Sequence, residues 1–111
     1  MPVKKPLEFL GASLRDLKAF SVPARREAGY QLDLVQDGLE PADWKPFKSA
    51  GAGVREIRIA EPDGAFRVIY VATFAEAVYV LHCFVKKTQQ TQLKDVRIAK
   101  KRFDDLVRSK S

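Results

Sequence analysis

Most side chains in this sequence that could do chemistry are cations placed on or just after strand-like segments. Arg58 and Arg67 lie in two successive segments of this kind, and Lys86 and Lys87 directly follow a third. A planar guanidinium group binds two phosphate oxygens at once, whereas an ammonium group acts as a point charge. Glu56 shares a strand face with Arg58, because side chains two residues apart point the same way. The pattern favours binding of a phosphate-bearing ligand.

The sequence offers little for metal or redox chemistry, because it contains a single histidine and a single cysteine. We therefore expect no zinc site, no internal disulfide and no cofactor. His82 has an ordinary pKa near neutrality, so it is a possible acid or base. Strand alternation places it with Val78, Val80 and Phe84, which favours a histidine in or beside the core. Cys83 is expected to be a small core residue.

The net charge of +6 is concentrated at the C-terminal end of the chain. Residues 86–111 hold nine basic and three acidic residues, whereas residues 1–85 hold eleven of each. A charge gathered in this way indicates a polyanionic partner, either a nucleic acid or an acidic protein surface. The alternative is a solvated basic helix without any partner. The N-terminus has no apolar run that could be a signal peptide or a membrane span, so we expect a cytoplasmic protein without a membrane partner.

The first half of the 111-residue chain predicts one strand and a helical hairpin. A strand is expected over residues 3–10, ended by Gly11, followed by a short helix over residues 14–20 with Ser13 as its N-cap. A second helix begins at residues 21–23 and stops at Gly38. Its apolar residues recur at helical spacing, namely Ala24, Ala28, Leu32 and Val35.

The second half predicts a loop, three antiparallel strands and a basic helix. Residues 40–53 are loop-like, with Trp44 and Phe47 as anchors to the core. Strands are expected over residues 54–59, 66–74 and 77–85, and the short connections between them force antiparallel pairing. The last helix, residues 94–107, turns Val96, Ala99, Phe103 and Leu106 to one face. The expected fold is one α+β domain over residues 1–111, with a twisted antiparallel sheet packed against the helical hairpin and a C-terminal basic helix.

Four segments in this order resemble a known family. They are GVREIRI, FRVIYVA, VYVLHCFVKKTQQT and DVRIAKKRFDDL. The chain resembles the phage-derived, HigB-like branch of the RelE superfamily of type II toxins from about Leu7 to Val107. The FVKKT run followed by a helix of the A-x-x-R type is the most specific part.

The resemblance implies a RelE-like fold and a metal-independent endoribonuclease that cleaves mRNA, commonly at codons exposed in the ribosomal A site. The implied partners are mRNA, the ribosome and a cognate antitoxin, often a helix-turn-helix protein that covers the basic surface. Two alternatives stay open. One is a non-catalytic nucleic-acid-binding module of the same fold, and the other is a degenerate, phage-derived interaction domain.

The resemblance also implies roles for individual residues. Arg67 matches the arginine that grips the scissile phosphate, and Lys86 and Lys87 match a basic pair that acts near the leaving oxygen. The family places lysines at the positions of Glu56 and Arg58, and only Arg58 keeps the cation. Glu56 is then either a general base or one half of a cross-strand ion pair with Arg67.

The remaining roles concern RNA binding. Thr88 and Gln89 could add hydrogen bonds to the RNA backbone or bases. The basic helix would contact ribosomal RNA phosphates or the antitoxin through Lys94, Arg97 and Lys101. The tyrosine that the family places near the start of this helix is replaced by Leu93. The stacking of a base on that aromatic ring is therefore not expected here.

Overall fold

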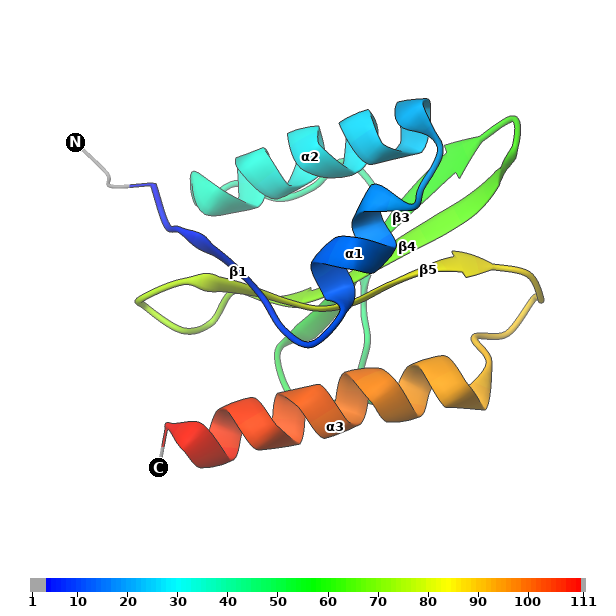
Figure 1. Cartoon of the computed structure of the whole chain (residues 1–111). Helices are drawn as coiled ribbons and strands as arrows, with labels where there is room; N and C mark the ends of the chain where they lie inside the picture. The colour runs from blue at the N-terminus through cyan, green and yellow to red at the C-terminus, as the bar shows by residue number, and fades with distance from the viewer. Residues whose placement is uncertain (1–3, 111) are drawn as a thin grey trace.

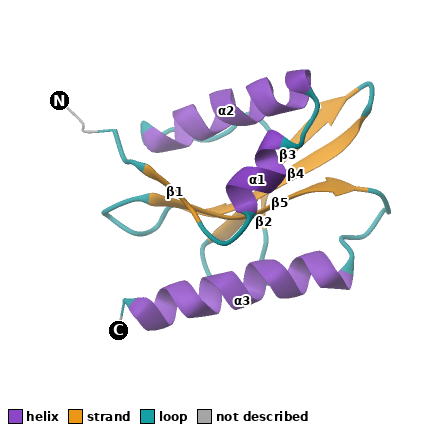
Figure 2. Cartoon of the chain, viewed as in Figure 1, coloured by secondary structure: helices purple, strands orange, loops and turns teal. Residues whose placement is uncertain are grey.

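The computed structural model of the chain describes residues 4–110 and has three layers. A five-stranded sheet lies between the helix pair α1 and α2 on one side and α3 on the other (Figures 1 and 2). This arrangement confirms the expected α+β class and is compatible with the RelE-like fold. The elements, in chain order, are β1 (Leu7–Phe9), α1 (Ser13–Lys18), α2 (Val22–Gln36), β2 (Trp44–Pro46), β3 (Val54–Glu61), β4 (Gly64–Val71), β5 (Val78–Lys86) and α3 (Leu93–Ser109).

The sheet has the strand order β1-β5-β4-β3-β2. The three strands expected to pair antiparallel, β3, β4 and β5, do so. At the edges, β1 runs parallel to β5, and β2 pairs antiparallel with β3. The sequence had indicated only loop around β2, which is a three-residue edge strand ending at Pro46. Proline is tolerated there because an edge strand need not donate a hydrogen bond on its outer side.

The helical hairpin covers one face of the sheet, as predicted. The recurrent apolar residues of α2 are all buried against that face: Ala24, Ala28, Leu32 and Val35. Gly38 adopts a φ of 80° just after the helix, a conformation that favours glycine and ends helices. From the sheet, Ile57, Ile59, Phe66, Val68 and Tyr70 complete this core.

Helix α3 covers the opposite face and has a core of its own. Ala99 and Leu106 are buried there, with Val96 and Phe103 packed beside them, so the predicted apolar stripe of the last helix is confirmed. Among residues 4–110, no helix combines the length and the apolar character needed to cross a membrane. One face of the sheet is therefore covered by α1 and α2, and the other by α3. Because side chains alternate between the two faces along a strand, every second residue points toward α3.

Three N-terminal expectations were wrong in detail. The first strand is limited to Leu7–Phe9, and Val3 lies outside the described residues. Helix α1 ends at Lys18 rather than at residue 20, and its N-cap is Ala12. Ser13 is the first helical residue, and its buried hydroxyl donates to the carbonyl oxygen of Val80 at 3.2 Å. The hydroxyl thus ties α1 to β5 instead of capping the helix.

A β-bulge in β5 changes which way His82 points. Ile69 of β4 pairs with His82, but the next residue, Tyr70, pairs with Val80, so Leu81 is extra. An extra residue reverses the alternation beyond it. Val80 therefore packs in the α1 and α2 core, whereas Phe84 packs in the α3 core. The expectation that His82 lies on the same face as Val78 and Val80 is wrong, because His82 bonds to α3.

Candidate functional site

Arg58 and Arg67 lie directly opposite each other on the α3 side of the sheet. They are register partners in β3 and β4, and their apolar strand neighbours Ile57 and Val68 are buried on the other face. Side chains in directly opposed positions have Cβ atoms about 4.5–5.5 Å apart, and like charges there are destabilising. The Arg58 Nε atom lies 3.4 Å from a carboxylate oxygen of Asp43, an ion pair at the solvent-exposed edge.

The Arg67 side chain is half-buried and lacks a close carboxylate. Its Nη1 donates to the carbonyl oxygen of Phe66 at 3.0 Å, and its buried Nε has no hydrogen-bond partner in the described part of the chain. Within residues 4–110, no carboxylate oxygen lies within 4.0 Å of this guanidinium group. Burial lowers the pKa of Arg67 below its ordinary value, and the charge of Arg58 lowers it further, while Glu56 opposes both. The positive charge of Arg67 is therefore not balanced by a contacting carboxylate in the described part of the chain.

Glu56 lies on the same face but does not form the expected ion pair with Arg67. Its register partner in β4 is Ile69, so it stands diagonal to Arg67, and Lys45 is its partner in β2. The two groups interact electrostatically, yet no contact within 4.0 Å joins them in the described part of the chain. Glu56 is only 9% exposed. The Glu56 carboxylate therefore acts on Arg67 through its charge and not through a direct contact.

Lys86 and Lys87 lie at the end of β5, the strand next to the one that carries Arg67. Phe84 is the register partner of Arg67, and Lys86 is the last residue of β5, opposite Ala65. Lys87 follows the strand and lines a cavity of about 250 Å³ with Phe84, Lys94 and Asp95. We call this the strand-end cavity; Val85 and Gln92 complete its lining. Phe84, which is the register partner of Arg67 and also lines this cavity, lies between the arginine pair and the cavity.

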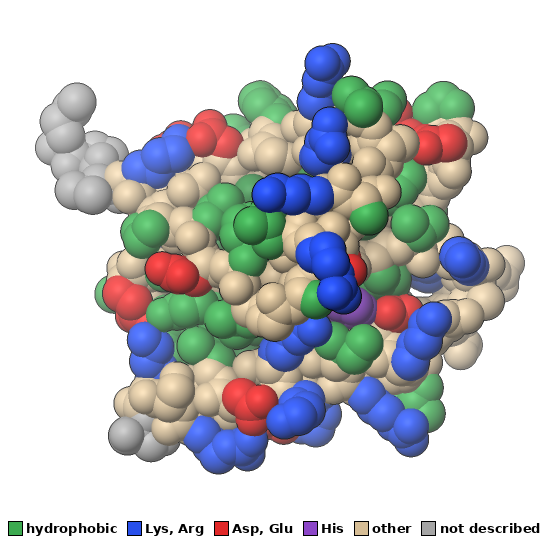
Figure 3. All heavy atoms as spheres, viewed as in Figure 1, with side chains coloured by type: hydrophobic (Ala, Val, Ile, Leu, Met, Phe, Trp, Pro, Cys, Tyr) green, Lys and Arg blue, Asp and Glu red, His purple; other side chains and the backbone are tan. Residues whose placement is uncertain are grey.

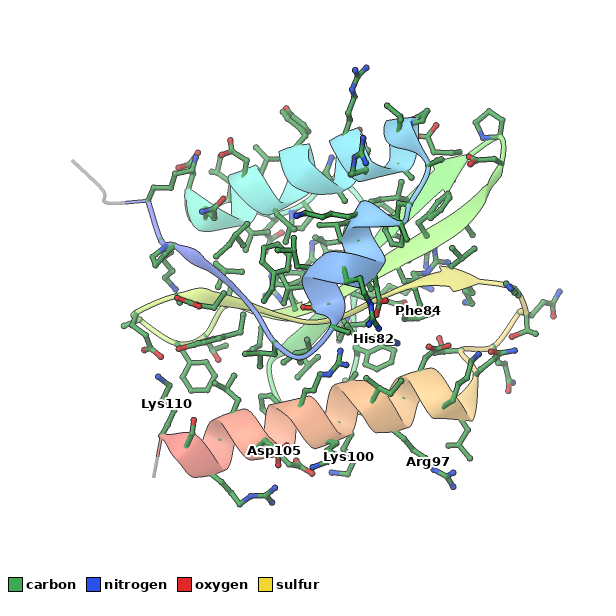
Figure 4. The ribbon with its side chains drawn as sticks, in the orientation of Figure 1. His82, Phe84, Arg97, Lys100, Asp105 and Lys110 are labelled. Carbon is green, nitrogen blue, oxygen red and sulfur yellow. The ribbon has the colours of Figure 1, made fainter. Side chains whose placement is uncertain are left out.

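Asp95, which lines the strand-end cavity, forms a buried pair with His82. His82 Nε2 and Asp95 Oδ1 are 2.8 Å apart, and the two residues are 5% and 7% exposed. The imidazole also stacks on the ring of Phe84, with 5.2 Å between centroids and 23° between planes. Figure 4 shows His82 and Phe84 between the sheet and α3. The sequence placed His82 in or beside the core but did not single out Asp95. The feature that could have indicated Asp95 is an acidic residue in the first turn of the helix that follows β5.

The buried histidine is only partly satisfied. Its Nδ1 atom is enclosed and has no hydrogen-bond partner among residues 4–110. Unpartnered buried polar atoms are rare in proteins and tend to occur at functional positions. The loop that follows β5 holds two further predicted residues. Thr88 donates its hydroxyl hydrogen to the carbonyl oxygen of Gln90, which shapes the loop, and the Gln89 side chain is exposed.

The basic residues of α3 divide into two groups. Lys94 and Arg97 are exposed and form no ion pair with any residue in the described range. Lys101 lies 3.1 Å from Asp105, and Lys100 lies 3.3 Å from Asp104. Figure 3 shows basic side chains along the lower edge, where α3 lies, interrupted by acidic ones. Uncompensated positive charge is therefore greatest at the start of α3, beside the strand-end cavity.

Within residues 4–110 there is no cluster of histidine, cysteine or acidic residues that could hold a metal ion. At the position of the family's tyrosine, Leu93 is 59% exposed and offers no aromatic ring for stacking. A search of curated proteins found no match. A family profile described as "Phage derived protein Gp49-like (DUF891)" matches residues 15–104, which include α2, all of β3, β4 and β5, and most of α3. The chain therefore belongs to the phage-derived, toxin-like Gp49 family.

Proposed function

We propose that this protein is the toxin of a type II toxin–antitoxin system, of the RelE/HigB type, and that it acts as an endoribonuclease on mRNA. The observation that carries the proposal is the opposed pair Arg58 and Arg67. Two cations in directly opposed positions cost stability unless an anion lies between or above them. A phosphodiester group supplies that anion, and guanidinium groups bind it with two hydrogen bonds each. Membership of a toxin-like family supports the same conclusion.

The proposed reaction is transfer of the phosphoryl group to the neighbouring 2′-oxygen. The 2′-oxygen attacks phosphorus, the bond to the 5′-oxygen breaks, and a 2′,3′-cyclic phosphate and a 5′-hydroxyl result. Arg58 and Arg67 would hold the phosphate and stabilise the charge that gathers on it. Lys87, or Lys86 beside it, would give a proton to the leaving 5′-oxygen, and Glu56 would accept the proton of the 2′-hydroxyl.

The same surface would also serve the partners of the proposed toxin. Lys94 and Arg97 are exposed cations beside the strand-end cavity, so they would contact phosphates of mRNA or ribosomal RNA. An antitoxin of the helix-turn-helix type would neutralise the toxin by covering these cations. Both partners are polyanionic or would present acidic groups, which fits the excess charge at this end of the chain.

Induced expression followed by primer extension on cellular mRNA tests the proposal. Wild type should arrest growth and produce discrete cleavage ends, and purified protein should leave 2′,3′-cyclic phosphates in the presence of EDTA. Arg67→Ala should lower cleavage at least about a hundredfold, since it removes a charge-stabilising donor. Arg26→Ala is the matched control, because Arg26 is an exposed arginine of α2 on the far side of the sheet. It should cleave like wild type.

Three outcomes would overturn the proposal in different ways. If wild type is harmless and does not cleave RNA but still binds it, the protein is a non-catalytic RNA-binding module. If wild type neither arrests growth nor binds RNA, it is a degenerate member or a protein-interaction domain. If Arg67→Ala and Arg26→Ala cleave equally, the opposed arginines are not the catalytic surface.

A further inference from the structure

We propose that the strand-end cavity is a nucleobase-binding subsite that prefers guanine, with Asp95 as the residue that recognises the base. This inference deepens the proposed function, because it names the base bound next to the phosphate on Arg58 and Arg67. The cavity lies between the end of β5 and the start of α3 and measures about 250 Å³. That volume is just below the range of about 300–1,000 Å³ typical of sites for drug-sized ligands. It suits a single flat ring system.

The lining of the cavity combines an aromatic ring, two ammonium groups and a carboxylate. These belong to Phe84, Lys87, Lys94 and Asp95. Proteins that read single-stranded RNA stack bases on aromatic rings and form hydrogen bonds with the base edges. Phe84 offers only a small part of its surface, at 8% exposed, because His82 stacks on its ring. Recognition in this cavity must therefore come mainly from the polar groups.

The carboxylate of Asp95 is fixed in position by the buried histidine. Oδ1 accepts a hydrogen bond from His82 Nε2 at 2.8 Å, which prevents the side chain from turning toward solvent. Oδ2 forms no hydrogen bond within residues 4–110, although Asp95 is only 7% exposed. A carboxylate accepts hydrogen bonds and donates none, and each of its oxygens has two lone pairs. The cavity therefore presents an oriented acceptor that the protein itself leaves unfilled.

Guanine matches this set of groups better than the other bases do. Its Watson–Crick edge carries two adjacent N–H donors, at N1 and N2, which can face the two oxygens of one carboxylate. Its O6 and N7 atoms are acceptors, and Lys87 or Lys94 can donate to them. Adenine and cytosine each place a ring-nitrogen lone pair beside their single amino group, and that lone pair repels a carboxylate. Uracil offers one N–H donor between two carbonyl oxygens.

The cavity and the opposed arginines are close enough to bind one nucleotide. Phe84, which lines the cavity, is the direct register partner of Arg67 in the neighbouring strand. Opposed side chains of this kind lie about 5 Å apart at Cβ. A base in the cavity and a phosphate on Arg67 would therefore belong to the same or to adjacent nucleotides. The His82–Asp95 pair thus acts as a positioning device for base recognition.

Binding of uncleavable RNA tests the inference independently of catalysis. The probes are fluorescent 2′-O-methyl pentanucleotides of uridine with guanine, inosine, adenine or cytosine at the centre, measured by fluorescence anisotropy at fixed salt. Wild type should bind the guanine probe at least about fivefold more tightly than the adenine or cytosine probe. Inosine, which lacks the N2 amino group, should fall between them. Asp95→Asn should remove the preference. Lys101→Ala, a charge change on α3 outside the cavity, should weaken all four probes equally.

Each result supports or overturns a distinct claim. Equal binding of the four probes by wild type overturns the guanine subsite and leaves the nuclease proposal intact. Binding of none of them overturns both. A guanine preference that persists in a folded Asp95→Asn variant overturns the assignment to Asp95. If that variant does not fold, amide NMR shifts of wild type titrated with guanosine monophosphate decide the matter: changes confined to residues around Lys94 and Asp95 support the site, and changes elsewhere overturn it.

Discussion

The opposed arginines predict that removing a charge stabilises the protein. Arg67→Met deletes the cation while keeping an apolar stem of similar length, so the packing along the strand is largely preserved. The pKa of Arg67 is lowered mainly by burial, which means that folding disfavours its charged form. Arginine is protonated throughout the accessible pH range, so this cost is present at every practical pH. The variant should therefore unfold at a higher temperature than wild type.

The size of the effect follows from the geometry. Favourable cross-strand pairs contribute about 0.2–1 kcal/mol, and we take the cost of opposed like charges to be of the same size. Solvent screens this half-exposed group, so we take about 0.5 kcal/mol as the gain. For a chain of this length, that corresponds to a rise in Tm of about 2–3 °C. With a bound anion, wild type should have the higher Tm of the two proteins. At a phosphate concentration ten times its Kd, wild type gains about 1.4 kcal/mol, whereas the variant gains much less.

Thermal unfolding by circular dichroism, with and without inorganic phosphate, measures both effects. Arg26→Met on α2 is the control, because Arg26 is exposed and has no ion pair within residues 4–110, so its replacement should change stability by less than about 0.5 kcal/mol. A lower Tm for Arg67→Met without phosphate would refute the reasoning. It would mean that the attraction between Arg67 and Glu56 outweighs both burial and the repulsion from Arg58.

Three further predictions concern titratable groups away from the arginines. The Lys110 ammonium lowers the pKa of Glu76 to about 2. The stabilisation from this pair is therefore present above pH 4.5 and is lost as the pH falls toward 2. In Lys110→Ala, the NMR titration midpoint of Glu76 should rise toward 4.5. Burial raises the pKa of the Cys83 thiol to about 12, so iodoacetamide at pH 8 should modify it only as urea unfolds the chain. His82→Leu should lower the free energy of unfolding in urea by about 2–3 kcal/mol, because it leaves the buried Asp95 carboxylate without its donor, and His82→Gln should lose less.

The sequence predicted those parts of the fold in which one periodicity runs without interruption. The apolar residues of α2 recur at helical spacing, and β3 to β5 have long apolar stretches with short connections. The edge strand Trp44–Pro46 was not predictable in this way, because three exposed or half-exposed residues carry no alternation. The prediction of Ser13 as an N-cap was wrong for a physical reason as well. A serine before a helix is usually a cap, but here its hydroxyl has a buried acceptor on β5.

The candidate site likewise was predictable only where strand alternation runs without interruption. Alternation correctly placed Glu56 and Arg58 on one strand face, because the pairing of β3 with β4 has no irregularity between residues 54 and 71. It misplaced His82, because the bulge at Leu81 shifts the register and leaves no mark in the sequence. The bond to Asp95 joins a strand to a helix across a loop, so local spacing could not reveal it.

The distribution of charge along α3 bears on how the proposed surface would work. Counting residues assigns the excess charge to the entire C-terminal segment, but Asp104 and Asp105 compensate the lysines one turn away from them. Pairs of this kind in water contribute little to stability, yet they cancel much of the field at a distance. Lys94 and Arg97 have no such partners among the described residues, so the field of the helix is strongest where it meets the end of β5. Under the proposed function, a polyanion attracted by this field would arrive at the opposed arginines and the strand-end cavity, not at the C-terminal half of the helix. The acidic residues of α3 would then direct an RNA strand as much as the basic ones would attract it.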